Sequence, residues 1–202
     1  MLQLAGVSVG FGTRLTWPDD YFQFQASLAY RWYYLKNWDY LYYMRNGTSN
    51  SITLGLNLSR TSIDNPIYTR RGSQFSIDLT MTPPASLFGK KNWAALSEAA
   101  SESNTDLTSR ERARASLYKW IEYWKLRFKS KTFTPITSPE SNYTLVLMTR
   151  ADFGLLGSWN KNIKTPFETF YFGGDGMTGN YTYATETISM SGYEKGQFTP
   201  YK

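Results

Sequence analysis

The sequence predicts an all-β fold, an antiparallel meander of six long strands, and three patterns predict it. Apolar and polar residues alternate over long stretches of the 202-residue chain. Alternation indicates strands, because successive side chains of a strand point to opposite faces of the sheet. The stretches are about 9 to 17 residues long, against roughly 5 to 6 in soluble sheets. Short and long connections follow one another in turn along the chain.

The first three expected strands, residues 2–17, 21–37 and 51–60, each have one apolar side and one small or polar side. In residues 2–17 the polar side is rich in glycine, and in residues 21–37 the apolar side is mostly aromatic. In residues 51–60 the alternation is regular. The three apolar sides consist of Ala5, Val7, Val9, Phe11, Leu15 and Trp17; Phe22, Phe24, Ala26, Leu28, Tyr30, Trp32 and Tyr34; and Ile52, Leu54, Leu56 and Leu58.

The last three expected strands, residues 74–82, 119–133 and 143–159, follow the same rule. Their polar sides carry the charges of the predicted sheet, and in residues 143–159 the apolar side is broken only by Thr149 and Gly157. The charged residues predicted to share the polar face of the sheet are Asp78, Lys125, Arg127, Lys129, Lys131, Arg150 and Asp152.

The connections alternate in length. Residues 18–20, 62–73 and 134–142 form short turns, whereas residues 38–50, 83–118 and the stretch from 160 onward form long loops. Short periplasmic turns and long extracellular loops are typical of transmembrane β-barrels. A soluble β-sandwich also has one apolar sheet face, but the strand length and the aromatic residues near strand ends favour the barrel. We therefore expect a six-stranded barrel segment over residues 1–159.

Residues 83–118 are expected to form an extracellular loop that contains helices. Residues 93–100 are rich in alanine, and Thr108 and Glu111 have the spacing of a capping box that opens a second helix. A short basic cluster follows in that helix, formed by Arg110, Arg112 and Arg114. It is either a contact for anionic lipopolysaccharide or simply a solvated helix face.

Composition excludes many activities. The chain has no Cys and no His, which removes disulfides, Cys/His zinc sites and every mechanism with a thiolate or a histidine base. The G-x-S-x-G match at residues 6–10 lies within a strand, not in the strand-to-helix turn of a hydrolase. The glycine-rich residues 173–176 are either a phosphate or metal loop or a tight turn. We expect no enzyme activity, no cofactor and no metal. We also expect no nucleic-acid partner, because most aromatic residues lie on the face opposite most basic residues.

Two motifs resemble those of a known family. Residues 60–73 read R-T-S-I-D-N-P-I-Y-T-R-R-G-S and resemble the R-x-S-x-D-N-P-x-F-P-x-x-G-S turn of BamA-type outer-membrane insertases, the bacterial surface antigen family. Residues 166–174 resemble the P-F-x-x-F-Y-x-G-G run at the start of that family's sixth extracellular loop. The corresponding residues are Asp64, Asn65, Pro66, Gly72 and Ser73 in the turn, and Pro166, Phe167, Glu168, Phe170, Tyr171, Gly173 and Gly174 at the loop start.

The resemblance implies a site at the loop tip as well. The family carries an R-G-F/Y tip on the sixth loop, and Met190, Ser191, Gly192 and Tyr193 stand in that place. In the family this loop folds back into the lumen, so residues 160–202 are expected to be its beginning. The family's tip arginine is Ser191 here. Either Gly192 and Tyr193 hold the tip by packing, or the protein is a divergent paralogue, or the sequence carries an error.

The resemblance also implies a function. It suggests a bacterial outer-membrane insertase that folds other barrels into the membrane, in contact with outer-membrane lipids, client outer-membrane proteins and assembly lipoproteins. A secretion or uptake channel of the same superfamily and an outer-membrane hydrolase are the alternatives. Six strands leave two unpaired edges, which lipid cannot satisfy. We therefore expect an interior piece of a sixteen-stranded barrel, without its periplasmic POTRA domains and without its signal peptide.

Overall fold

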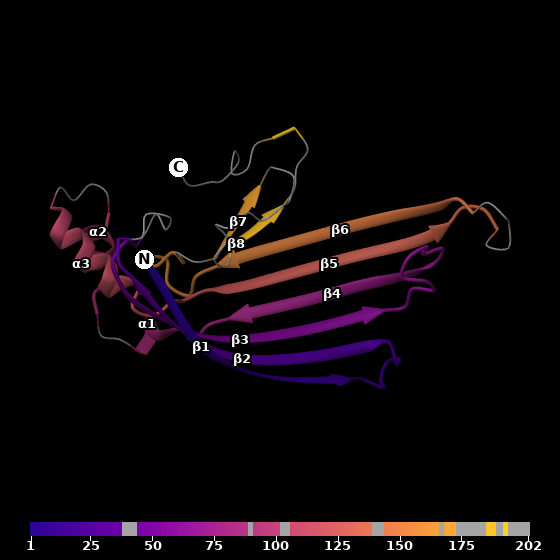
Figure 1. Cartoon of the computed structure of the whole chain (residues 1–202), viewed down its shortest axis with the longest axis horizontal. Helices are drawn as coiled ribbons and strands as arrows, with labels where there is room; N and C mark the ends of the chain where they lie inside the picture. The colour runs from indigo at the N-terminus through magenta and orange to yellow at the C-terminus, as the bar shows by residue number, and fades with distance from the viewer. Residues whose placement is uncertain are drawn as a thin grey trace.

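The computed structural model describes residues 1–37, 44–88, 91–101, 106–138, 144–165, 168–172, 185–188 and 192–193. Six strands form one antiparallel sheet in sequence order, so the predicted meander is confirmed (Figure 1). The strands are β1 (Leu2–Arg14), β2 (Phe22–Leu35), β3 (Gly47–Thr61), β4 (Gly72–Met81), β5 (Trp124–Pro135) and β6 (Val146–Gly157).

Several strand boundaries differ from the sequence-based expectation; β1 ends at Arg14 instead of residue 17, and β6 spans Val146–Gly157 instead of residues 143–159. The largest differences are at the starts of β3 and β5. β3 begins at Gly47 instead of residue 51, because Gly47 to Asn50 continue the ladder with the end of β2. β5 begins at Trp124 instead of residue 119, because the preceding residues cross to β3. There the Asn50 N–H donates to the Lys119 carbonyl and the Ile121 N–H donates to the Asn50 carbonyl, both at 2.9 Å.

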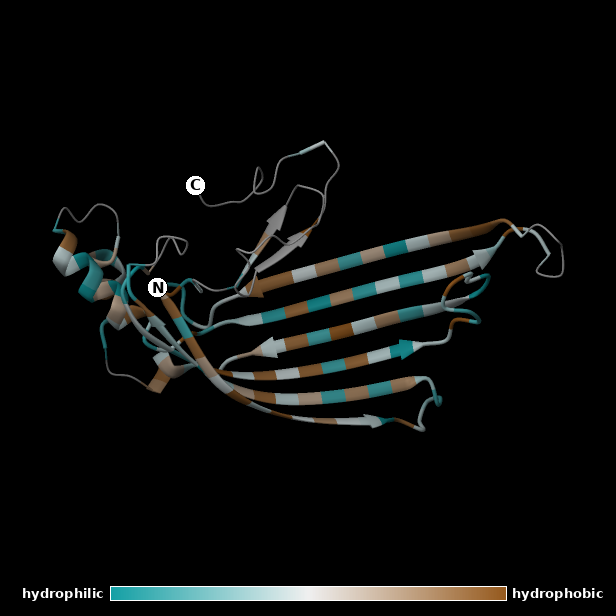
Figure 2. Cartoon of the chain, viewed as in Figure 1, coloured by the Kyte–Doolittle hydropathy of each residue, from teal (hydrophilic) through white to brown (hydrophobic). Residues whose placement is uncertain are grey.

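The register places like residues opposite one another across the sheet. Residues directly opposite in an antiparallel pair lie on the same face. One row of partners is Phe24, Leu58, Ile77, Phe128 and Phe153, and the next is Gln25, Asn57, Asp78, Arg127 and Gly154. The resulting alternation of apolar and polar bands is visible in Figure 2. The sheet therefore has one apolar and one polar face, and the predicted charges share the polar face.

The apolar face is exposed on β1, β2 and β6 and half-buried on β4 and β5. Val9 in β1 is 70% exposed, Leu28 in β2 55% and Phe153 in β6 69%. On β2 the apolar side runs from Phe22 to Tyr30, which spans nine residues. A tilted strand needs about 9 to 11 residues to cross a bilayer. An apolar band of this height, with nothing packed on it in the part of the chain that the structure describes, matches the lipid-facing surface of a barrel.

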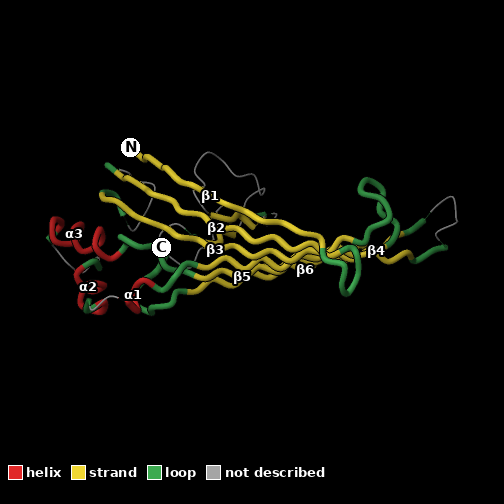
Figure 3. The backbone as a smooth tube through the Cα atoms, turned by 90° about the horizontal axis from the view of Figure 1, so that it is seen from below, coloured by secondary structure: helices red, strands yellow, loops and turns green. Residues whose placement is uncertain are grey.

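The buried core lies at one end of the sheet, where the long connections are. Its helices are α1 (Ala85–Phe88), α2 (Trp93–Ala99) and α3 (Leu107–Leu117), and all three lie at the end opposite the short turns (Figures 1 and 3). The core consists of Tyr33, Leu35, Met44, Ala100, Ala113, Leu117, Tyr118, Ile121, Tyr123 and Ile163. We call these helices and this core the cap.

The start of α3 corrects the expected capping box. The N-cap is Asp106, whose carboxylate accepts from the Thr108 N–H at 3.0 Å, so Thr108 is inside the helix. Asp106 precedes the first helical residue and its short carboxylate reaches the free N–H groups of the first turn. The expected helix over residues 93–100 is confirmed as α2, which ends one residue earlier.

Beyond β6, the described residues add a second small sheet. β7 (Thr169–Phe172) pairs in parallel with β8 (Thr185–Ile188). Both lie near the end of β6 that adjoins the cap (Figure 1). Sequence reasoning treated this region as loop. Among the helices in the described residues, none is long and apolar enough to cross a membrane.

Candidate functional site

The first candidate region is the turn between β3 and β4, and its Asp-Asn-Pro motif forms a hydrogen-bonded cage. The Asp64 Oδ1 accepts from the backbone N–H groups of Asn65, Arg70 and Arg71 at 2.9 to 3.3 Å. The Asn65 Oδ1 accepts from the N–H groups of Ile67 and Tyr68. Two adjacent side chains thus satisfy five backbone donors, which explains why the turn needs an acid followed by an amide.

Gly72 and Ser73 close the same turn. Gly72 has φ +117°, and a Cβ atom at this position would lie 2.2 Å from the Ser62 carbonyl oxygen. Only glycine fits such a backbone. The Ser62 N–H donates to the Ser73 carbonyl at 2.9 Å and so joins the two ends of the turn. Pro66 lies at the tip of this turn, beyond Asn65.

Arg60 links this turn to the turn between β1 and β2. Its guanidinium lies 2.8 Å from the Asp19 carboxylate and donates to the Ser62 hydroxyl, also at 2.8 Å. It also lies over the ring of Tyr21, 5.6 Å from its centroid. Arg60 stands at the rim of the apolar face, opposite Phe22, so its charge is neutralised at the height where the apolar band ends.

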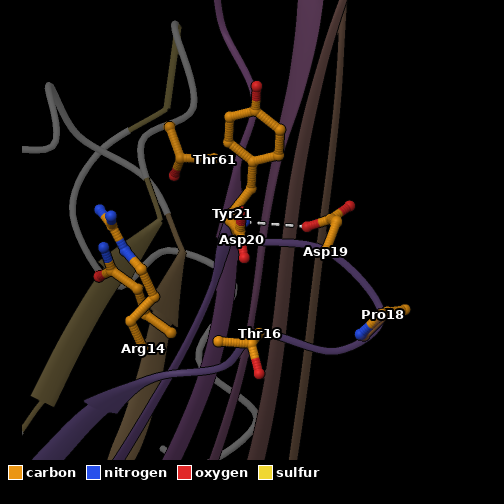
Figure 4. Close-up of a pocket in the computed structure, with 8 residues that line it drawn as sticks. Arg14, Thr16, Pro18, Asp19, Asp20, Tyr21 and Thr61 are labelled. Atoms are coloured by element: carbon orange, nitrogen blue, oxygen red, sulfur yellow. Dashed lines mark hydrogen bonds between the residues drawn. The ribbon is translucent and has the colours of Figure 1, made fainter.

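An open polar pocket of about 520 Å³ adjoins this link (Figure 4). Arg14, Asp19, Asp20 and Thr61 are among its lining residues, and the Tyr21 N–H donates to the Asp19 carboxylate at 3.0 Å. The two carboxylates, from Asp19 and Asp20, are too few ligands for a metal site, and the guanidinium of Arg14 is not a metal ligand. No group of three or more ligating side chains occurs among the described residues.

The two turn carboxylates have perturbed acidity. The hydrogen bond from Arg60 lowers the pKa of Asp19. For Asp64, partial desolvation acts in the upward direction, but the N–H groups of Arg71, Arg70 and Asn65 outweigh it and lower the pKa. Both carboxylates are therefore charged at neutral pH, as their hydrogen bonds require.

The second candidate region is the start of the long loop, where Glu168 meets the polar face of the sheet. The Glu168 carboxylate lies 3.0 Å from the Lys125 Nζ, and the two side chains are only 11% and 10% exposed. The Tyr123 hydroxyl donates to the same carboxylate at 3.4 Å. Burial, and next the negative charge of Glu168, raise the pKa of Tyr123, which keeps this hydroxyl protonated as a donor.

Phe170 continues this contact two residues further on. Its ring lies against Gly154 in β6, where a Cβ atom would be 2.8 Å from the nearest ring carbon. The Lys125 Nζ lies 5.1 Å from the centroid of the same ring. Glu168 and Phe170 have the spacing that puts alternate residues of an extended strand on one side. The loop start thus lies over β5 and β6 on the polar face.

The remaining residues of the motifs are only partly described. Pro166, Phe167, Gly173, Gly174, Met190 and Ser191 lie outside the described residues, as does the glycine-rich stretch 173–176. Tyr171 lies in β7. Gly192 has φ +87°, and a Cβ atom there would have no described neighbour within 4 Å. Tyr193 is 44% exposed.

The polar face around the loop start carries further ion pairs. The Arg127 guanidinium lies 3.3 Å from the Asp78 carboxylate, which also accepts from the Asn57 amide. Arg150 pairs with Asp152 at the other end of the sheet. Charges facing lipid would be costly, whereas charges on a wet lumenal wall are not. The polar face therefore suits the lumen of a barrel.

Sequence reasoning missed several of these residues as members of a site. Lys125 was expected on the polar face, but its pairing with Glu168 was not expected. A glycine inside a strand pattern can mark the close approach of another chain segment, and this signal could have indicated Gly154. Asp19 gave no signal, because its partner Arg60 is far away in the sequence.

Comparison with known protein families decides the assignment. The chain matches the Omp85 superfamily domain over residues 2–202. The chain belongs to the Omp85 superfamily. The superfamily comprises barrels of the bacterial outer membrane or its organellar equivalent, and it includes insertases and secretion channels. No curated protein matches the sequence.

Proposed function

We propose that this chain is part of a bacterial outer-membrane insertase that folds and inserts other outer-membrane proteins. The observation that carries the proposal is the turn between β3 and β4, where Asp64, Asn65, Gly72 and Ser73 of the insertase-like motif each have a structural role. Asp64 and Asn65 bind the turn backbone, Gly72 provides a backbone that other residues rarely adopt, and Ser73 closes the turn. The assignment to insertases rests on the resemblance of this motif.

The loop of residues 160–202 would fold into the lumen, with the tip residues Met190, Ser191, Gly192 and Tyr193 on the inner wall. The contact of Glu168 with Lys125 supports this course, because it places the loop start on the polar face. The positive φ of Gly192 fits a turn at the tip. With Ser191 in place of an arginine, the tip would depend on packing of Gly192 and Tyr193.

The six strands would form one sector of a larger barrel in the outer membrane. β1 and β6 each pair with one neighbour in the described sheet, and the smallest bacterial barrels use eight strands. Further strands would therefore close the ring. Client outer-membrane proteins and lipids would contact the barrel, and assembly lipoproteins would bind through periplasmic POTRA domains.

Depletion of the protein in the bacterium that encodes it tests the proposal. We expect several unrelated outer-membrane barrels to lose their folded, heat-modifiable form together, because an insertase serves many clients. A secretion or uptake channel would instead lose one transported substrate while the barrels assemble normally. That second outcome would contradict the insertase assignment and leave the superfamily membership intact.

A further inference from the structure

We propose that Lys125 and Gly154 form a seat in the lumenal wall that holds the start of the long loop and sets its course across the lumen. They act as positioning residues: Lys125 binds Glu168 by charge, and Gly154 receives the ring of Phe170 by shape. The inference deepens the proposed function, since it concerns the same loop, but the position of the loop can be measured without any insertase activity.

The charge half of the seat follows from burial. The Lys125 side chain is only 10% exposed, and a charge buried to this extent is costly unless an opposite charge compensates it. The residues opposite Lys125 in the neighbouring strands are Thr80 and Leu156, and neither carries a charge. The loop supplies Glu168 at 3.0 Å. The wall therefore holds a cation for which the loop carries a matching anion.

The shape half of the seat follows from the missing side chain at Gly154. The three ring carbons at the end of Phe170 lie 2.8 to 3.3 Å from the place where a Cβ atom would stand, closer than normal van der Waals contact. An alanine at this position would push the ring outward. The neighbouring Lys125 Nζ lies near the same ring, at 5.1 Å from its centroid, so the two halves of the seat are in contact.

The polar face offers a matched control for this site. Gly10 in β1 lies on the same face, but a Cβ atom there would be 3.8 Å from its nearest neighbour, the Ala26 carbonyl oxygen, which is ordinary contact. Gly10→Ala therefore makes the same chemical change as Gly154→Ala at a place where there is room. A difference between the two variants reports on the ring of Phe170 and not on the loss of a glycine from a strand.

The first experiment tests the charge half by cross-linking. Because these 202 residues contain no Cys, Gly154→Cys with Phe170→Cys introduces a single reactive pair into them, and any cysteine elsewhere in the encoded protein is first replaced by serine. In this background the ring of Phe170 is absent, and the ion pair between Lys125 and Glu168 remains. We expect a short bifunctional thiol reagent to link the pair in outer membranes, Lys125→Glu to abolish the link, and Lys125→Glu with Glu168→Lys to restore it. Gly10→Cys with Phe170→Cys should give no link.

Equal cross-linking in all charge variants, or no recovery in the double reversal, would overturn the proposal.

The second experiment keeps the proposal testable if the variants with reversed charges fail to fold. In planar bilayers, Gly154→Ala should change the open-pore conductance, because the loop start is displaced from the wall, and Gly10→Ala should leave it unchanged. Equal conductance in the two variants would also overturn the seat. If the cross-link forms in a protein that has no assembly activity, the proposed function is wrong and the seat for the loop still stands.

Discussion

Replacing Gly72 with alanine should destabilise the barrel through the turn between β3 and β4. Gly72 has φ +117°, and a residue forced into such a region costs about 1 to 3 kcal/mol. The new Cβ atom would also lie 2.2 Å from the Ser62 carbonyl oxygen, so the turn must open. Opening lengthens the hydrogen bond from Ser62 to Ser73, now 2.9 Å, at a cost of about 1 kcal/mol. Together we expect a loss of about 2 to 4 kcal/mol.

The measurement is the free energy of unfolding in detergent micelles, from a urea titration followed by tryptophan fluorescence and by gel migration. Gly10→Ala is the control, because a Cβ atom at this position has room. Both substitutions reduce the backbone freedom of the unfolded chain equally, so Gly10→Ala should leave the free energy of unfolding unchanged or slightly raise it. If Gly72→Ala unfolds at the same urea concentration as Gly10→Ala, then the turn adapts freely. The physical account of the motif would then be wrong.

Three further predictions concern the turn, the two faces and the loop tip. The pKa of Asp64 lies below its ordinary value of 3.8, so its charge stabilises the turn at neutral pH, and this stabilisation is lost as the pH falls through the lowered pKa. Proteolysis of the turn should therefore rise at such acidic pH, and in Asp64→Ala it should already be high at neutral pH. Leu28→Arg should cost about 2 to 4 kcal/mol of unfolding free energy because the cation would face lipid, whereas Gln25→Arg on the polar face should cost little; equal losses would contradict the assignment of the faces. Gly192→Val should impair assembly of client barrels, because valine disfavours φ +87°, whereas Ser191→Arg should preserve or improve it; the reverse pattern would argue against an insertase-like loop.

The strands and their order in the sheet could be predicted because both signals are local. A two-residue period fixes which side chains share a face, and short turns make consecutive strands neighbours. The first residues of β3 gave no such signal, since Thr48, Ser49 and Asn50 are all polar. They are extended because β2 continues beside them and the segment after α3 binds Asn50. Tertiary contacts decided this boundary.

In the candidate site, too, contacts between residues close in sequence could be expected, and contacts between distant residues could not. The turn motif was found from its resemblance to the family's turn, and its contacts join residues that are close along the chain, such as Asp64 and Arg71. Its link to Asp19 spans 41 residues and could not be inferred. The capping box was wrong because the N-cap is Asp106, two residues before the expected Thr108, which lies inside the helix.

The seat for the loop lies where the cap and the membrane-crossing sheet meet, and this position explains how the loop can be held firmly. Tyr123, the residue before β5, is bound twice by Thr82, the residue after β4: Thr82 donates its N–H to the Tyr123 carbonyl at 2.9 Å, and the Tyr123 N–H donates to the Thr82 hydroxyl at 2.8 Å. Tyr123 is buried in the cap core and Lys125 follows it after one residue. The cap core therefore fixes the backbone that presents Lys125, so the end of the sheet that carries the cap determines where the long loop begins.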